Sequence, residues 1–101
     1  MQRTTFYIGL LSPIAGNMPT NIAARRTLAL DSLSDAYDAL TFADVLGMWG
    51  GIEEPSLRVE LLGEDSPEER AKAREIAATL REDLQQDAIG LTFEPVTFEI
   101  I

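Results

Sequence analysis

Apolar and polar residues along this chain follow two spacings that alternate in a fixed order. Runs rich in aromatic and β-branched residues predict strands at residues 4–11, 42–49, 57–62 and 88–101. Apolar residues three and four positions apart predict helices at residues 21–40 and 66–86. The predicted order is therefore strand, helix, strand, strand, helix, strand.

Both predicted helices begin beside residues that can cap them. Thr20 or Asn21 is expected to cap the first helix through its side-chain oxygen. The capping pattern at the second helix is stronger. Ser66 can cap the helix, Pro67 suits the first helical position and Glu69 completes a capping box.

Glycine and proline divide the strands from one another. Gly47 interrupts the second strand, and the segment from Gly50 to Pro55 is predicted to be the hairpin connection. Pro95 lies inside the last strand, where it is tolerated only at a sheet edge or a bulge. The second and last strands are therefore expected at the edges of the sheet.

This order of elements favours an α+β fold, the ferredoxin-like βαββαβ sandwich. Short connections and right-handed crossovers place two antiparallel helices on one face of a four-stranded antiparallel sheet. A chain of 101 residues is expected to form a single domain, residues 1–101.

Charges on the two predicted helices complement each other when the helices run antiparallel. The first helix has Arg25 and Arg26 near its start, which opposes its own dipole. The expected partners of these arginines are the acidic residues at the end of the second helix, Glu82, Asp83 and Asp87. A second set of pairs is expected between Asp31, Asp35 and Asp38 and the cations Arg70, Lys72 and Arg74.

Composition narrows the chemistry that this chain can perform. It has no histidine and no cysteine, so nucleophile–histidine pairs, thiol chemistry and imidazole metal ligands are excluded. No calcium-loop or phosphate-loop spacing occurs, and the acidic doublets Glu53-Glu54 and Glu64-Asp65 are interpreted as solvated turns. We therefore expect no metal and no cofactor.

The charge balance and the absence of cysteine bear on partners and location. A formal net charge of −9 disfavours direct binding to nucleic acid, which needs lysine and arginine, and favours a partner with a basic surface. No apolar run is long enough to predict a membrane span. The lack of cysteine makes a cytoplasmic location the expectation.

The sheet face left uncovered by helices is the first candidate binding surface. Its predicted partner-binding residues are Tyr7, Trp49, Arg58, Glu60 and Leu62. Aromatic and arginine side chains are typical anchors of protein interfaces, although Tyr7 and Trp49 could equally pack the rim of the core. An open sheet with apolar residues is often covered by a second copy of itself, so a homodimer is expected.

An anion site is the alternative. The first strand leads through a loop into a helix N-terminus, where N–H groups and two guanidinium groups could hold a phosphate or carboxylate. The residues of this alternative site are Asn17, Thr20, Asn21, Arg25 and Arg26. The competing interpretation is that the two arginines pair with the second helix.

Three segments resemble a family of small uncharacterised α+β proteins from phages and bacteria. These segments are TTFYIGL, GMWGGIEEPSLRVELL and LQQDAIGLTFEPVTFE. In that family an aromatic-Ile-Gly-Leu strand, a Gly-x-Trp and a Glu-Pro-Ser/Thr-Leu strand recur in this order. The loop SPIAGNMPTN departs from the family, in which an Asp-rich turn is expected. The resemblance implies a ferredoxin-like fold and a phage origin, and it implies no reaction.

These observations predict a non-enzymatic, acidic binding protein that acts through surface contacts with a protein partner. A phage-encoded inhibitor of a host defence or nucleic-acid-handling protein, located in the host cytoplasm, is the specific hypothesis. The alternative is a small-ligand binding protein that holds an anionic metabolite or nucleotide at the first strand–helix loop. An enzyme that uses carboxylates alone is the least expected outcome, since it needs a carboxylate pair in a closed pocket.

Overall fold

The computed structural model describes residues 1–11 and 21–101 and has the predicted order of elements. These elements are β1 (Gln2–Gly9), α1 (Ile22–Ala36), β2 (Thr41–Trp49), β3 (Ile52–Gly63), α2 (Pro67–Asp83) and β4 (Gly90–Pro95). The four strands form one antiparallel sheet in the order β2-β3-β1-β4, with β2 and β4 at its edges as predicted.

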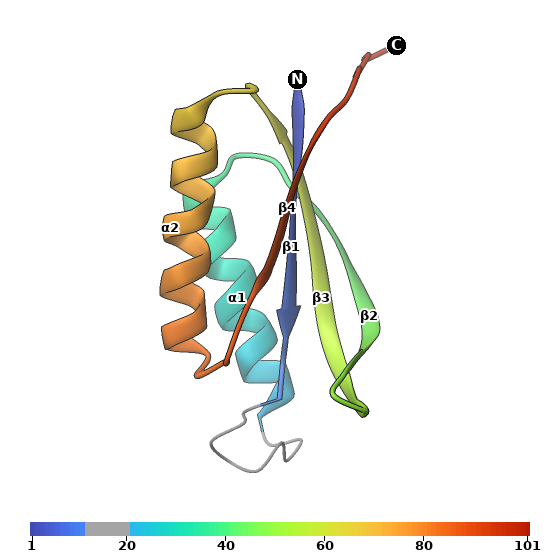
Figure 1. Cartoon of the computed structure of the whole chain (residues 1–101), viewed down its shortest axis with the longest axis vertical. Coiled ribbons are helices and arrows are strands. Elements are labelled where there is room, and N and C mark those ends of the chain that lie inside the picture. The colour runs from blue at the N-terminus through green and yellow to red at the C-terminus, as the bar shows by residue number, and fades with distance from the viewer. Residues whose placement is uncertain (12–20) are drawn as a thin grey trace.

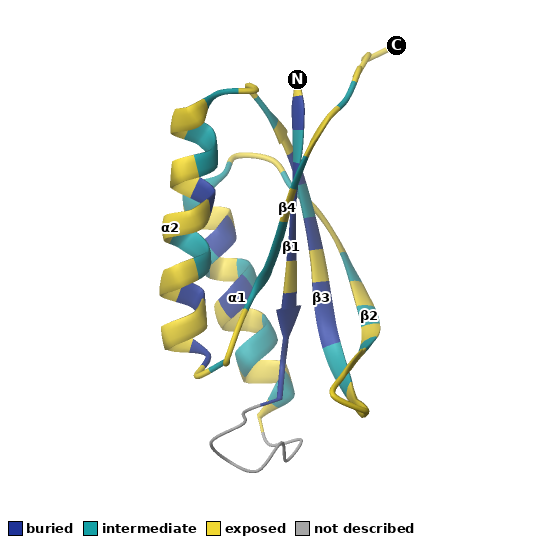
Figure 2. Cartoon of the chain, viewed as in Figure 1, coloured by how far each residue is buried: buried dark blue, intermediate teal, exposed yellow. Residues whose placement is uncertain are grey.

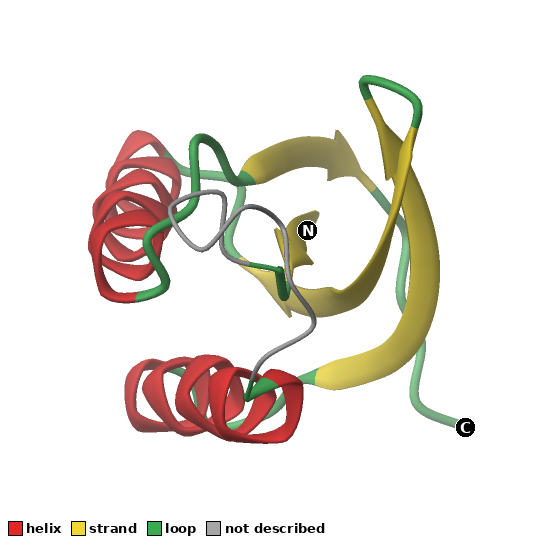
Figure 3. Cartoon of the chain, turned by 90° about the horizontal axis from the view of Figure 1, so that it is seen from below, coloured by secondary structure: helices red, strands yellow, loops and turns green. Residues whose placement is uncertain are grey.

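The two helices run in opposite directions along the sheet (Figure 1). Seen from below, both lie on the same side of the strongly curved sheet (Figure 3). The predicted ferredoxin-like α+β fold is therefore confirmed. No helix in the described part of the chain is long and apolar enough to cross a membrane.

The hydrophobic core lies between the helices and the sheet (Figure 2). Phe6 of β1 and Val59 of β3 are opposite each other in the ladder and are both fully buried. The other fully buried core residues include Ile8, Ala29, Leu33 and Leu57. Because side chains alternate along a strand, Tyr7 and Gly9 of β1 and the even-numbered residues of β3 face the opposite, open side.

The β2–β3 hairpin turns more tightly than predicted. Gly50 and Gly51 both have positive φ, 57° and 80°, which a two-residue hairpin turn requires and which glycine adopts without strain. The prediction of a connection from Gly50 to Pro55 is therefore wrong, and Pro55 lies within β3 opposite Leu46. Pro55 has no N–H to donate, but its carbonyl accepts a hydrogen bond from the Leu10 N–H at 3.0 Å.

The two terminal strands also differ from their predicted limits. The first strand is β1, Gln2–Gly9, displaced toward the N-terminus from the predicted 4–11. The last strand ends at Pro95, well before Ile101. Pairing of β4 with β1 ends where Pro95 lies opposite Gln2, and the Val96 N–H donates the last bond to the Met1 carbonyl at 3.0 Å.

Helix α1 lacks the predicted side-chain cap and is shorter than expected. Asn21 adopts a left-handed backbone (φ 58°) and its side chain makes no capping bond, while Thr20 lies outside the described residues. The helix ends at Ala36 because Tyr37 is extended. The Lys72 ammonium donates to the Ala36 carbonyl at 2.9 Å, which satisfies one of the open carbonyls at the helix end.

Helix α2 begins as the sequence predicts. Ser66 Oγ accepts a hydrogen bond from the Glu69 N–H at 3.2 Å, and Pro67 is the first helical residue. The capping box is only half formed, because the Ser66 N–H donates to the Glu64 carbonyl at 3.1 Å instead of to Glu69.

A Ser66→Ala substitution tests this cap. We expect the free energy of unfolding in urea to fall by about 1 kcal/mol, because one helix-end N–H loses its acceptor. Ser34→Ala, an exposed position within α1, is the matched control and should leave stability unchanged within a few tenths of a kcal/mol. Equal effects of the two substitutions would contradict a capping role.

The predicted ion pairs between the helices are wrong. Arg26 Nε lies 2.7 Å from Asp44 Oδ1 of β2, and Arg70 Nη1 lies 2.6 Å from Asp65 Oδ1 in the turn before α2. Arg74 lies over the ring of Phe93 in β4, 5.2 Å from its centroid. These three arginines therefore find partners on a strand or turn, whereas Lys72 and Arg25 donate to backbone carbonyls at the end of the other helix. No ion pair joins α1 to α2 within residues 1–11 and 21–101.

Candidate functional site

A pocket of about 470 Å³ lies at one end of the sheet, on the side that the helices leave open. Its walls come from β1, from the β2–β3 hairpin and from the segment that joins α2 to β4. The lining residues are Tyr7, Gly9, Leu11, Trp49, Ile52, Glu54 and Gln86–Gly90. Its volume lies in the range of small-molecule sites.

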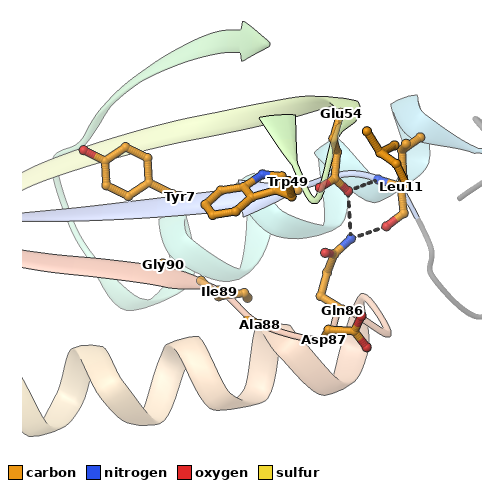
Figure 4. A pocket seen from close by; sticks show the side chains of 11 residues that line it. Tyr7, Leu11, Trp49, Glu54, Gln86, Asp87, Ala88, Ile89 and Gly90 are labelled. Atoms are coloured by element: carbon orange, nitrogen blue, oxygen red, sulfur yellow. Dashed lines mark hydrogen bonds between the residues drawn. The ribbon is translucent and has the colours of Figure 1, made fainter. Parts of the chain in front are cut away.

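The Glu54 carboxylate occupies one end of the pocket and is held by two donors. The Leu11 N–H donates to Oε2 at 2.9 Å, and Gln86 Nε2 donates to the same oxygen at 3.4 Å (Figure 4). Gln86 Nε2 also donates to the Leu11 carbonyl. Among the described residues, no donor binds Oε1, so this oxygen is free to accept a hydrogen bond from a ligand.

Two aromatic side chains extend the pocket from Glu54. The Trp49 indole and the Tyr7 ring follow the carboxylate in a row along the sheet (Figure 4). They are 58% and 38% exposed, so both keep surface for a ligand. A planar ring that stacks on such side chains gains about 1–3 kcal/mol.

The pocket is acidic. Glu54 and Asp87 are its two ionisable acids, and no lysine or arginine occurs among the described residues that line it. Aromatic faces and carboxylates both attract positive charge. The arrangement therefore suits a ligand that combines a planar ring with a cationic group.

Arg25 lies behind the pocket as a structural residue. Its guanidinium donates to the carbonyls of Leu10 at 2.8 Å, Leu11 at 3.4 Å and Leu84. Burial lowers the pKa of Arg25 below its usual value, and the charge of Glu54 opposes this shift. This contact connects the end of β1 to the end of α2 beneath the pocket.

The structure gives protein partners to both arginines of the alternative anion site. Arg25 binds backbone carbonyls, and Arg26 binds Asp44, a hydrogen bond that raises the pKa of Arg26 and lowers that of Asp44. Asn21 is exposed, whereas Asn17 and Thr20 lie outside the described residues. Within the described residues, no group of three or more acids is arranged to hold a metal ion.

The predicted open-face residues divide into two groups. Tyr7 and Trp49 come together in the pocket. Arg58, Glu60 and Leu62 lie farther along β3, where Arg58 Nε is 3.5 Å from Glu60 Oε1 and Leu62 is exposed. The structure does not place these three in the pocket.

Sequence reasoning missed Glu54, Gln86 and Asp87. The interpretation of Glu53-Glu54 as a solvated turn is wrong for Glu54, which is half-buried within β3, while Glu53 is exposed. The glycine pair in the sequence indicates on which face of β3 Glu54 lies. A turn at Gly50-Gly51 starts β3 at Ile52, and alternation then directs Glu54 to the open face.

The sequence matches no protein-family model and no curated protein. Among solved structures, the chain is similar to a phage SAM lyase in its apo state, with a TM-score of 0.74 and 18% identity over 92% of this chain and 78% of that one. It is also similar to a phage SAM lyase in complex with S-methyl-5′-thioadenosine, with a TM-score of 0.65 and 17% identity over 92% and 79%. The de novo designed protein Foldit4 has a TM-score of 0.56 and 9% identity, over 95% and 98%.

These neighbours support the resemblance to small ferredoxin-like phage proteins in its general form. They contradict the predicted function, because the similar phage structures are of an enzyme and not of a non-enzymatic binding protein. The expected homodimer and the expected lack of nucleic-acid contact stay predictions.

Proposed function

We propose that this chain is an enzyme that binds S-adenosylmethionine (SAM) in the open-face pocket and cleaves it to release S-methyl-5′-thioadenosine. The observation that carries the proposal is the row formed by Tyr7, Trp49 and Glu54, two aromatic faces followed by a fixed carboxylate. SAM has an adenine ring at one end and an ammonium group at the other, with a sulfonium between them. Ligand and pocket thus match in the order of their chemical groups, and similar structures of an enzyme that acts on SAM support the choice.

In this proposal each side chain of the row binds one part of the ligand. Tyr7 and Trp49 stack on the adenine ring. Glu54 binds the α-ammonium group through Oε1. A carboxylate placed at the sulfonium would stabilise the substrate more than the transition state, because the sulfonium loses its charge as the bond breaks, whereas the ammonium keeps its charge throughout.

The reaction that fits these residues needs no base from the protein. The carboxylate oxygen of the substrate attacks its own γ-carbon, so that a C–O bond forms while the C–S bond breaks. Sulfur takes the electron pair and becomes the neutral thioether of S-methyl-5′-thioadenosine, and the remaining fragment closes as homoserine lactone. Atoms and charges balance without a proton transfer. The protein contributes by holding the methionine chain of the substrate bent, so that its carboxylate oxygen lies behind the γ-carbon and in line with the C–S bond.

Product analysis tests this function. The purified protein incubated with SAM should release S-methyl-5′-thioadenosine and homoserine lactone in equal amounts, measured by liquid chromatography and mass spectrometry against a protein-free control. Release of S-adenosylhomocysteine instead would indicate methyl transfer. No turnover, with no binding of SAM in calorimetry, would refute the proposal.

A further inference from the structure

We propose that three strand glycines, Gly9, Gly47 and Gly90, are positioning residues that leave space for the pocket side chains. The space at Gly9 is taken by Glu54. A β-carbon at Gly9 would lie 2.6 Å from Glu54 Oε2 and would overlap the rest of the carboxylate. The Glu54 carboxylate therefore packs directly on Gly9 while Oε2 accepts from the Leu11 N–H, and a β-carbon at position 9 would displace it.

Gly47 and Gly90 leave space for the two aromatic side chains in the same way. A β-carbon at Gly47 would lie 3.0 Å from Trp49 Nε1, and one at Gly90 would lie 3.1 Å from Tyr7 Cβ. Tyr7 and Gly90 are direct ladder partners, so the ring leans across the neighbouring strand. One glycine on each of β1, β2 and β4 thus accepts one side chain of the pocket.

Backbone conformation does not require glycine at these positions. Positive φ among the described glycines occurs at Gly50 and Gly51, in the hairpin turn, and not at the three strand positions. Glycine weakens a strand interior, and it is typically found there where another group approaches closely. The close approach here is that of the pocket side chains, so these glycines serve the site and not the fold.

Gly9→Ala is the sharpest test, with Gly63→Ala as the matched control. Gly63 is also a strand glycine, but a β-carbon there would meet only Glu69 Oε2, at an ordinary contact distance of 3.8 Å. Hydrogen exchange of the Leu11 amide reports on the Glu54 carboxylate without any ligand. We expect exchange at Leu11 to become at least tenfold faster in Gly9→Ala and to stay unchanged in Gly63→Ala. Unchanged exchange at Leu11 in folded Gly9→Ala would overturn the proposal.

Ligand affinity supplies a second readout, which rests on the proposed function. Gly9→Ala should lower the affinity for SAM at least tenfold and leave that for S-methyl-5′-thioadenosine unchanged, because the thioadenosine lacks the ammonium group. The double variant Gly9→Ala/Glu54→Gln should lose no more affinity for SAM than either single variant, since both remove one interaction. Additive losses, or an equal loss for both ligands, would contradict positioning through Glu54.

Two further outcomes keep the test decisive. If wild-type protein binds no SAM, the proposed function fails, while exchange at Leu11 still decides the role of Gly9. If Gly9→Ala does not fold, the double variant Gly9→Ala/Glu54→Ala should fold, because the overlapping carboxylate is gone. Failure of that double variant to fold would contradict the proposal.

Discussion

Glu54→Gln is expected to raise the Kd for SAM by about 10- to 100-fold and to leave the Kd for S-methyl-5′-thioadenosine unchanged. The substitution keeps the shape of the side chain and an oxygen that can accept from the Leu11 N–H, and it removes the negative charge. A hydrogen bond between charged groups contributes about 1.5–3 kcal/mol, which corresponds to that range of affinity. Isothermal titration calorimetry with both ligands measures the difference.

The neighbouring residue provides the control for this experiment. Glu53→Gln makes the same change of charge one position earlier, on an exposed residue that faces the other side of β3. We expect its Kd for SAM to change less than twofold, since exposed charges are screened by solvent and salt. An equal loss for SAM and for S-methyl-5′-thioadenosine in Glu54→Gln would place the carboxylate at the ribose and contradict its assignment to the ammonium group.

Arg25→Ala is expected to lower the free energy of unfolding by about 2–4 kcal/mol. The guanidinium is partly buried and donates to the carbonyls of Leu10, Leu11 and Leu84, which join the end of β1 to the end of α2. Truncation removes these bonds and leaves the carbonyls of Leu10 and Leu84 without this donor, and each such loss costs on the order of 1–3 kcal/mol. Urea denaturation followed by circular dichroism measures the change.

The adjacent arginine separates a structural role from anion binding. Arg26 forms an exposed ion pair with Asp44, and solvent screens such pairs, so Arg26→Ala should change the free energy of unfolding far less than Arg25→Ala. Phosphate added to the wild type should not raise its stability, because both guanidinium groups already have partners in the protein. Stabilisation by millimolar phosphate that disappears in both variants would restore the anion site at the first strand–helix loop.

Local signals in the sequence were sufficient for the fold. Ser66 and Pro67 marked the start of α2, and the alternation of Leu57, Val59 and Leu61 marked the buried face of β3. The element order then left few topologies, because handedness and short connections exclude most of them. The ends of the strands were harder to predict, because pairing with a neighbour and not local propensity sets where β1 and β4 stop.

The candidate site was only partly predictable, because its residues meet through tertiary packing. The sequence predicts Tyr7 and Trp49 as aromatic residues on an open sheet, and both line the pocket. Gln86 and Asp87 follow a helix whose end the sequence places only roughly, so nothing local directs them toward Glu54. The absence of histidine and cysteine argued against an enzyme, but a reaction in which the substrate supplies its own nucleophile needs neither.

The position of β4 makes the pocket depend on the last element of the fold. Tyr7 belongs to β1, whereas its ladder partner Gly90 begins β4. A chain cut before Ala88 keeps the sequence of both helices and of the β2–β3 hairpin, but it loses Ala88, Ile89 and Gly90 from the wall of the pocket. C-terminal truncations that remove β4 should therefore abolish ligand binding before they abolish helical structure.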